Sequence, residues 1–576
     1  HQMASGFDTY AKQLLPRLAR TGKYELAEFA AYGHPDAEGE FDWTFYGNLP
    51  IAQHEKNIYD QSPANSFGMW RFDQVVLDFK PDIVLTYRDP WMDDWIAQSP
   101  SREFFHWLWM PTVDSAPQQR RWLQNFSKCD ALLAYSEFGQ KTLLEQSGGK
   151  LNVVGCASPA VDPDVYKPVP SMKAHRELFG LDPDMKIVGT VMRNQRRKLF
   201  IELMRAFRKF LDKAPKEIAE KSFLYLHTSY PERNGWDIPL GIQENNLHGK
   251  VLATYICRNC GNFHVAKFQD AIKTCPHCGV RSAVMPNVGQ GLSIPNLIKI
   301  YNLMDMYVQY AICEGFGMPQ VEAASCGVPV AAVDYSAMED VVRFTNGYPI
   351  NIKHKYREME TGADRVYPDN DHLADIMLEH FSLSEEEIAR KRMMTRKGTL
   401  DRYNWDRTAA VWEEYIDSYT PVGKQGKWDS PYQEVGVHDK GAVPEMSNEN
   451  LVRWSYSEAL KRPEDAFSFE SLEWIQSLNV GAHIVTGDPV TRESFWEMIT
   501  QKASNKRMFE LVRCGLQQMA KYDFIENNTP LPTRTVSLLD AIALPPSSLT
   551  ITETTVVINN IARSKLIVDW KPVDGV

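Results

Sequence analysis

The chain has 576 residues, of which 43% are hydrophobic, so it is long enough to form several domains with large cores. Its formal net charge of −11 argues against a surface that coats DNA in general. No apolar run reaches the roughly 18 residues that a membrane span needs. We expect no signal peptide, and nine cysteines in so long a chain do not make a disulfide scaffold. These features predict a cytoplasmic protein in a reducing compartment.

The chain opens with a glycine that is followed by a helical pattern. Gly6 precedes residues 8–20, in which Leu14, Leu15 and Leu18 lie on one apolar side. A glycine in this place is typical of the turn between the first strand and the first helix of a Rossmann-like domain. The strand that should precede the turn is missing, so it either lies before the first residue or is supplied otherwise.

Two sets of alternating strands and helices follow, and this alternation predicts parallel sheets in an α/β fold. The strands of the first set are expected at 24–32, 82–87, 104–110, 131–135 and 153–156, and its helices include 118–127 and 137–147. The prolines of a linker come next, at Pro159, Pro163, Pro168 and Pro170. The strands of the second set are expected at 186–192, 223–228, 251–256, 306–311 and 328–333. Ligands of such sheets bind outside the carboxyl ends of the strands.

The most informative segment carries two glutamates, Glu314 and Glu322, with a glycine-bearing turn between them. The predicted strand 306–311 precedes the turn, and a helix predicted over residues 320–326 ends at Gly327. A turn into a helix N-terminus directs free N–H groups and a helix dipole at its ligand, and a diphosphate suits both. Glu314 on the turn can reach a neutral polar part of a ligand. Glu322, expected in the first helical turn, can accept from sugar or ribose hydroxyls, so the pattern fits a nucleotide-diphosphate sugar.

A basic motif follows the predicted strand 186–192. Arg193 and Lys198 lie in the connection after this strand, at a ligand-facing strand end. A diphosphate leaving group gains charge as the glycosidic bond breaks, and fixed cations stabilise that charge most in the transition state. Arginine offers phosphate a planar fork and lysine a point charge. The alternative is that Arg196, Arg197 and Lys198 form a solvated basic turn.

Together the two motifs resemble the signature of glycosyltransferase family 4, whose retaining enzymes have the GT-B fold. The resemblance covers about residues 1–420 and includes the continuation at 327–332. It implies two Rossmann-like domains that face a cleft, a UDP- or GDP-sugar donor, and transfer to a hydroxyl acceptor with retention of anomeric configuration. It implies that Arg193, Lys198 and Glu314 are catalytic, and that the donor-binding residues are Gly6, Gly315, Phe316, Gly317, Met318 and Glu322.

An aromatic strand at 104–110 leads to Asp114 on the side where relatives of this family bind sugar and acceptor. Asp114 can orient an acceptor hydroxyl or take its proton, and we count it among the catalytic residues. His106 lies in mid-strand and is expected in the core. Ser136 resembles a family element but is equally a plain helix N-cap. Because no Asp-x-Asp pair stands at a strand end, we predict no catalytic metal ion.

Four cysteines form two Cys-x-x-Cys turns, and this spacing predicts one structural Zn²⁺. The ligands would be Cys257, Cys260, Cys275 and Cys278. Four thiolates leave no open position for catalysis. The family core does not need this zinc ribbon, so we expect an insert at residues 253–285. The insert is basic, with Arg258, Lys267, Lys273 and Arg281 against Asp270. This segment either stabilises the fold or contacts an anionic acceptor such as nucleic acid.

These patterns divide the chain into an acceptor domain at 1–165, a donor domain at 166–400, a crossover helix at 401–425 and an extension at 426–576. Residues 383–419 are expected to be helical, and 424–446 a linker. In the extension we expect helices at 451–460, 472–478 and 494–521 and strands at 549–558 and 566–570, a mixed α/β module of unknown role.

Three other functions fit parts of the pattern. One is a phage-type enzyme that glycosylates DNA bases, with nucleic acid as the acceptor. Another is a non-catalytic assembly or binding protein with the GT-B fold, which the intact motif residues argue against. The third is a phosphorylase or sugar-phosphate synthase, although no lysine motif for a pyridoxal cofactor is present. The sequence leaves the sugar, the nucleotide, the acceptor and the oligomeric state open.

Overall fold

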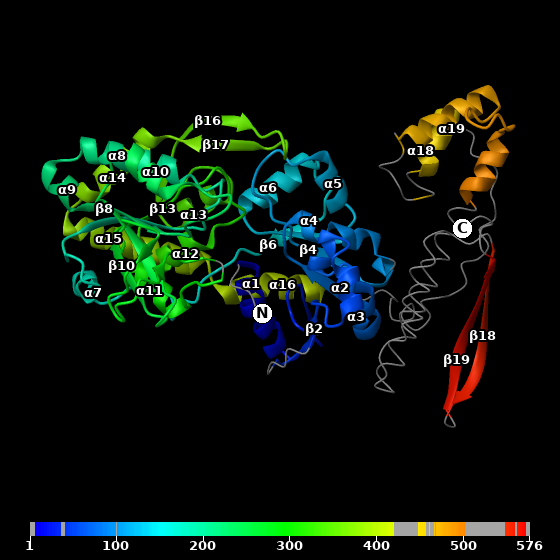
Figure 1. Cartoon of the computed structure of the whole chain (residues 1–576), viewed down its shortest axis with the longest axis horizontal. Helices are drawn as coiled ribbons and strands as arrows, with labels where there is room; N and C mark the ends of the chain where they lie inside the picture. The colour runs from blue at the N-terminus through cyan, green and yellow to red at the C-terminus, as the bar shows by residue number, and fades with distance from the viewer. Residues whose placement is uncertain are drawn as a thin grey trace. The chain divides into compact units, whose positions relative to one another are not determined.

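The computed structural model describes residues 6–35, 41–99, 101–287, 289–419, 447–456, 460, 466, 468–500, 548–558 and 561–571 (Figure 1). The chain forms two compact units. The first comprises residues 1–70, 81–98 and 105–422, and the second comprises 71–80, 99–104 and 423–576. Within the described ranges, no helix has both the length and the apolar composition that a bilayer crossing needs.

A parallel four-stranded sheet organises the first part of the first unit. Its strands run in sequence order: β3 (Ile83–Thr86), β4 (His106–Trp109), β5 (Ala131–Ala134) and β6 (Val153–Cys156). The strands β4 and β5 are buried along their whole length, which explains why they appear in the sequence as continuous apolar runs. The helices here are α1 (Gly6–Arg20), α2 (Gln53–Tyr59), α4 (Pro90–Asp93), α5 (Arg120–Phe126) and α6 (Glu137–Gln146), with 3₁₀ turns η1 (Pro63–Phe67) and η2 (Asp94–Gln98).

A nine-stranded sheet organises the second part of the same unit. The strand order is β11-β12-β9-β8-β7-β13-β14-β15, and β10 also pairs with β9. The bounds are β7 (Lys186–Val191), β8 (Ser222–His227), β9 (Val251–Cys257), β10 (Phe263–Lys267), β11 (Ile272–Lys273), β12 (Ala283–Val284), β13 (Met306–Gln309), β14 (Val330–Val333) and β15 (Tyr348–Ile350). The pairs from β9 through β8, β7, β13 and β14 to β15 are parallel, whereas β10 and β12 run antiparallel to β9.

Amphipathic helices bury their apolar sides in the core of this second part. In α8 (Phe200–Lys213), buried Phe200, Leu203, Phe207 and Phe210 recur at helical spacing. The other helices are α7 (Met172–Leu178), α9 (Lys216–Lys221), α10 (Ile238–Glu244), α11 (Ile294–Tyr301), α12 (Met318–Ser325), α13 (Ala337–Phe344) and α14 (Asn370–Ser382). An antiparallel ribbon of β16 (Ile352–Arg357) and β17 (Asp364–Pro368) lies outside the large sheet (Figure 1).

Two helices end the first unit: α15 (Glu385–Arg402) and α16 (Trp405–Ser418). Helix α16 contacts α1, the first helix of the chain. The indole N–H of Trp412 in α16 donates to the hydroxyl of Tyr10 in α1 over 2.7 Å. Tyr10 in turn donates to the carbonyl of Ala157 over 2.9 Å. Both Trp405 and Trp412 are buried, as expected of anchors in the predicted helical stretch.

The second unit contains the helices α3 (Phe72–Phe79), α18 (Asn448–Trp454) and α19 (Phe469–Val480), the turn η3 (Arg102–Phe104), and the hairpin β18 (Ser548–Ile558) and β19 (Ile561–Lys571). A small core around Leu451, Leu478 and Phe495 contains residues of α18 and α19. The predicted linker 424–446 and the part of the predicted helix 494–521 beyond residue 500 lie outside the described residues.

Two elements differ from the sequence predictions, the strand at 24–32 and the ribbon β16–β17. The predicted strand 24–32 shortens to β1 (Ala27–Ala30), which pairs with the unpredicted β2 (Thr44–Gly47) instead of the four-stranded sheet. The strands of the segment 253–285 extend the large sheet through β9, and its role as an insert stays a prediction. The sequence did not predict the ribbon β16–β17. Strand β16 is mostly exposed and charged, so its residues do not alternate between apolar and polar.

Candidate active site

The two sequence motifs meet at one edge of the large sheet. Strands β7 and β13 are parallel neighbours, so the turns after them leave the sheet at the same edge. The two turns are joined by backbone hydrogen bonds, from Leu199 N to the oxygen of Tyr310 and from Ile312 N to the oxygen of Arg197, both over 3.0 Å. This pairing brings the basic turn against the segment that carries Glu314.

Lys198 and Glu314 form an ion pair at this edge, and their side chains are only 8% and 7% exposed. Glu314 also accepts from Gln309 Nε2 over 2.6 Å, and Gln309 accepts from the Tyr307 hydroxyl over 2.6 Å. Burial, followed by the charge of neighbouring Arg197, lowers the pKa of Lys198. The cationic form of Lys198 therefore depends on the anions around it.

The turn between the glutamates needs its glycines. Gly317 has φ +85°, which favours glycine, and it caps α12. A Cβ on Gly315 would lie 2.2 Å from Cγ2 of Thr112, so the turn approaches the loop after β4 too closely for any other residue. Phe316 is buried, and its ring packs against Tyr403 with ring centroids 5.5 Å apart. Met318 begins α12.

Glu322 does not lie where the sequence analysis placed it. Because α12 already begins at Met318, Glu322 falls in its second turn and not in the first. Its carboxylate accepts from the Tyr301 hydroxyl over 2.5 Å and from the Tyr166 hydroxyl over 3.3 Å. Burial raises the pKa of Glu322. A carboxylate has about four lone-pair positions, so two tyrosines leave room for further donors.

Arg193 and Arg197, two of the three arginines of the basic turn, face different surroundings. Arg193 is half-exposed and pairs with Glu232 over 2.7 Å, and Glu232 also accepts from the Ser229 hydroxyl over 2.6 Å. Arg197 is exposed, and its backbone bonds to Ile312 beside the Glu314 turn. From the sequence, Arg197 was expected only as part of a solvated basic turn.

Asp114 follows β4 and lies beside the Glu314 turn. It accepts from Arg365 Nη1 over 3.1 Å, from the Ser115 hydroxyl over 2.8 Å and from the Cys313 thiol over 3.3 Å. Asp89 follows β3. Burial raises the pKa of Asp89, and the negative charge of Asp114 raises it further. The structure thus brings Asp114 to the segment of Glu314 and Lys198.

Several residues of this neighbourhood were missed from the sequence. Asp89 follows the predicted strand 82–87, and its place at a strand end was the available signal. Ser336 Oγ accepts from the backbone N of Glu314 over 3.0 Å, and its own backbone has φ +56° and ψ −150°. Such strained backbone concentrates at functional sites, but it leaves no trace in the sequence. Cys313 and Arg365 contact Asp114 only because the fold brings distant segments together, so no local sequence pattern predicts these contacts.

Gly6 is the first residue of α1 and is exposed. An added Cβ would meet no atom within 4 Å, and the residue has no positive φ. Neither the space nor the backbone therefore requires glycine at this position, in contrast to Gly315 and Gly317.

The four cysteines of the two Cys-x-x-Cys turns come together. Their sulfurs all lie within 4.8 Å of one another, with Cys257–Cys278 at 3.6 Å and Cys260–Cys275 at 3.7 Å. Tetrahedral coordination with Zn–S bonds of about 2.3 Å places sulfurs about 3.8 Å apart. The turns are alike, since the glycine after each pair has φ +73° and donates to the carbonyl of the first cysteine over 2.9 Å. The quartet can hold one metal ion.

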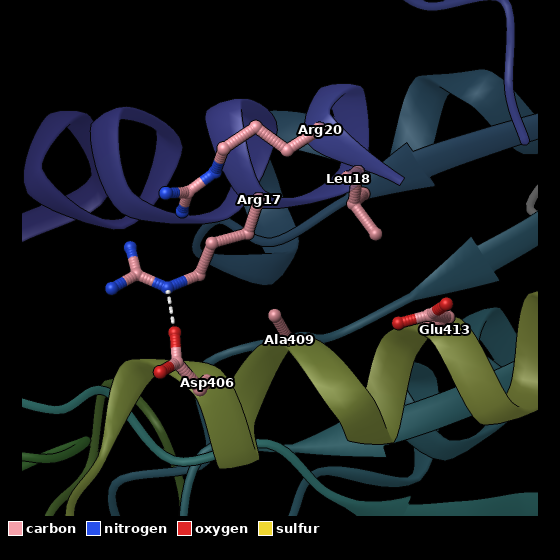
Figure 2. A pocket seen from close by; sticks show the side chains of 6 residues that line it. All are labelled: Arg17, Leu18, Arg20, Asp406, Ala409 and Glu413. Atoms are coloured by element: carbon pink, nitrogen blue, oxygen red, sulfur yellow. Dashed lines mark hydrogen bonds and ion pairs between the residues drawn. The ribbon is translucent and has the colours of Figure 1, made fainter. Parts of the chain in front are cut away.

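Figure 2 shows a pocket of about 200 Å³ that lies elsewhere, between α1 and α16. Its lining residues are Arg17, Leu18, Arg20, Asp406, Ala409 and Glu413. Charged lining residues of this pocket already have ion-pair partners, since Arg17 pairs with Asp406 over 2.7 Å and Glu413 with Lys23 over 2.6 Å. The pocket contains none of the motif residues, so we do not assign the donor to it.

Comparisons with known proteins give a family match over part of the chain and a shared fold. Residues 286–376, which contain both glutamates, match the family model described as glycosyl transferases group 1. No curated protein matches the chain. The sucrose-phosphate synthase of Thermosynechococcus elongatus has a similar structure, with 17% identity, a TM-score of 0.52, and coverage of 72% of this chain and 93% of that one. The apo structure of OtsA has 12% identity, a TM-score of 0.50, and coverage of 73% and 98%. The structural likeness shows a GT-B-like α/β fold, and the family match shows that the chain is a glycosyltransferase.

Proposed function

We propose that the chain is a retaining glycosyltransferase of family 4 that uses a nucleotide-diphosphate sugar, such as a UDP- or GDP-sugar, and a hydroxyl acceptor. The observation that carries this proposal is the buried Lys198–Glu314 pair at the shared edge of β7 and β13. The two sheets support the proposed acceptor domain at 1–165 and donor domain at 166–400.

The donor diphosphate would bind at the basic turn. Lys198 gives it a buried cation, and a bound diphosphate would favour the charged form of Lys198. Arg193 uses Nε and Nη2 on Glu232, which leaves the donors of Nη1 for a phosphate oxygen. Arg197 adds an exposed cation beside the same turn. When the bond between the anomeric carbon and the diphosphate breaks, these cations stabilise the charge that develops on the leaving oxygen.

The sugar and the acceptor would lie between Glu314 and Asp114. As Lys198 turns to the diphosphate, Glu314 becomes available to the transferred sugar. Asp114 orients the acceptor hydroxyl and takes its proton as the oxygen bonds to the anomeric carbon. Attack from the leaving-group face retains the anomeric configuration, and this part of the proposal follows from the family resemblance.

The two glutamates should differ in nucleotide binding. We propose that Glu322 holds the ribose through the lone pairs that Tyr301 and Tyr166 leave free. Glu322→Gln should therefore weaken binding of free UDP or GDP by about tenfold, as expected for a lost charged hydrogen bond. Glu314→Gln should change nucleotide binding less than about threefold, because the bound diphosphate replaces Glu314 as the counter-ion of Lys198 and the free nucleotide carries no sugar. Titration calorimetry measures both affinities.

Glu385→Gln, at the exposed start of α15, is the matched control and should bind the nucleotide like the wild type. Equal losses of nucleotide affinity in Glu314→Gln and Glu322→Gln would contradict the division of roles between the two glutamates.

We also propose that the cysteine quartet holds one structural Zn²⁺. The sulfur spacing supports it, and four thiolates leave no position for a reacting group. The contacts of the basic residues here favour the folding role over binding of nucleic acid. Lys273 Nζ donates to the carbonyl of Lys267 over 3.0 Å, and Arg281 pairs with Asp270 over 2.8 Å. Lys267 lies over the Phe223 ring at 5.4 Å. These cations are engaged within the fold.

A further inference from the structure

The ribbon β16–β17 is anchored to both halves of the proposed active site. Asp364 N donates to the carbonyl of Ala116 over 2.9 Å, in the segment that follows Asp114. Two residues further along β17, Val366 N donates to the carbonyl of Ile312 over 3.2 Å, directly before Cys313. The strand therefore runs between the loop of Asp114 and the turn of Glu314, and residue 365 lies between its two anchor points.

Arg365 fills this position, and its side chain is only 7% exposed. Its Nη1 lies 3.1 Å from Asp114 Oδ1 and donates to Cys313 Sγ over 2.8 Å. Its Nε pairs with Glu358 over 2.9 Å, so the guanidinium is oriented by the ribbon itself. A buried guanidinium held in this way fixes the direction of the carboxylate that it contacts.

We propose that Arg365 is a positioning residue, and that the ribbon β16–β17 uses it to hold Asp114 against the Glu314 turn in the orientation that receives the acceptor hydroxyl. The inference rests on the proposed role of Asp114 in sugar transfer. A catalytic group that is displaced by about 1 Å loses much of its rate advantage, although the substrates still bind. Loss of Arg365 should therefore act on turnover and spare donor binding.

The test compares variants in steady-state kinetics of sugar transfer, with nucleotide affinity measured by calorimetry. Arg365→Met should lower kcat by about tenfold to a hundredfold and change the donor KM by less than about threefold. Arg365→Lys, which keeps the charge, should recover part of the loss. Arg357→Met is the matched control, because Arg357 lies in the same ribbon but is exposed and pairs with Asp364 within it over 2.8 Å. It should transfer sugar at the wild-type rate.

A double-mutant cycle separates this inference from the proposed function. In an Asp114→Asn background, Arg365→Met should have almost no further effect, because both residues act through one carboxylate. Multiplicative losses, or wild-type turnover in Arg365→Met, would overturn the positioning role. Wild-type turnover in Asp114→Asn would instead overturn the proposed role of Asp114. If Arg365→Met does not fold, the Arg365→Lys cycle with Asp114→Asn decides in the same way.

Discussion

Replacing Lys198 by methionine should lower kcat/KM for sugar transfer by about a hundredfold to a thousandfold, as expected when a fixed charge at the leaving group is lost. The loss should exceed that of Arg193→Met, because Lys198 is buried whereas Arg193 is half-exposed and held by Glu232. Steady-state kinetics with saturating acceptor measures both effects. Lys213→Met is the matched control, since Lys213 is an exposed lysine whose ion pair with Asp375 spans 2.6 Å.

Lys198→Met also leaves Glu314 without its cation, and breaking a buried ion pair destabilises a protein by roughly 3–5 kcal/mol. The double variant Lys198→Met/Glu314→Gln removes both charges and should regain much of that stability in thermal unfolding. It should stay inactive. Wild-type kcat/KM in folded Lys198→Met would contradict the donor site that we propose.

Removing the metal should destabilise the fold without acting on the chemistry directly. We expect about one zinc per chain in protein purified without chelators. Cys275→Ser should lose that zinc and several kcal/mol of stability, and its melting temperature should fall by about 5 °C. Elemental analysis and calorimetric unfolding measure the two quantities.

Cys156→Ser is the matched control, because Cys156 lies outside the quartet and its sulfur already contacts the Ser158 hydroxyl over 3.4 Å. It should keep the zinc. Chelator-free protein that contains no zinc, or a Cys275→Ser variant that keeps the wild-type melting temperature, would contradict the structural metal site.

The sequence predicts the parts of this fold whose signal is local. Strands such as β5 and β7 appear as apolar runs because both faces of a parallel sheet are covered. The sequence placed Lys198 and Glu314 each at a strand end, and the structure shows that the two strands are neighbours and that the side chains pair. The spacing of the cysteines likewise predicts their meeting, since two short turns determine it.

What the sequence misses depends on tertiary contacts. Arg365 reaches Asp114 across 251 positions, from a ribbon whose exposed strand has no apolar pattern. Glu322 was assigned to the wrong helical turn because the start of α12 is set by Gly317 in a left-handed conformation. Its tyrosine partners come from Tyr301 in α11 and from Tyr166 between β6 and α7, and no local pattern links them to α12.

The most direct test of the central claim is turnover of nucleotide sugars. The protein is incubated with UDP- and GDP-sugars, with and without DNA and small hydroxyl acceptors, and mass spectrometry detects the released nucleoside diphosphate and the glycosylated product. We predict that at least one of these donors is consumed by the wild type, and that Glu314→Gln lowers this turnover by about a hundredfold. Release of nucleoside diphosphate at the same rate in wild type and Glu314→Gln, or no release from any UDP- or GDP-sugar, would contradict the account.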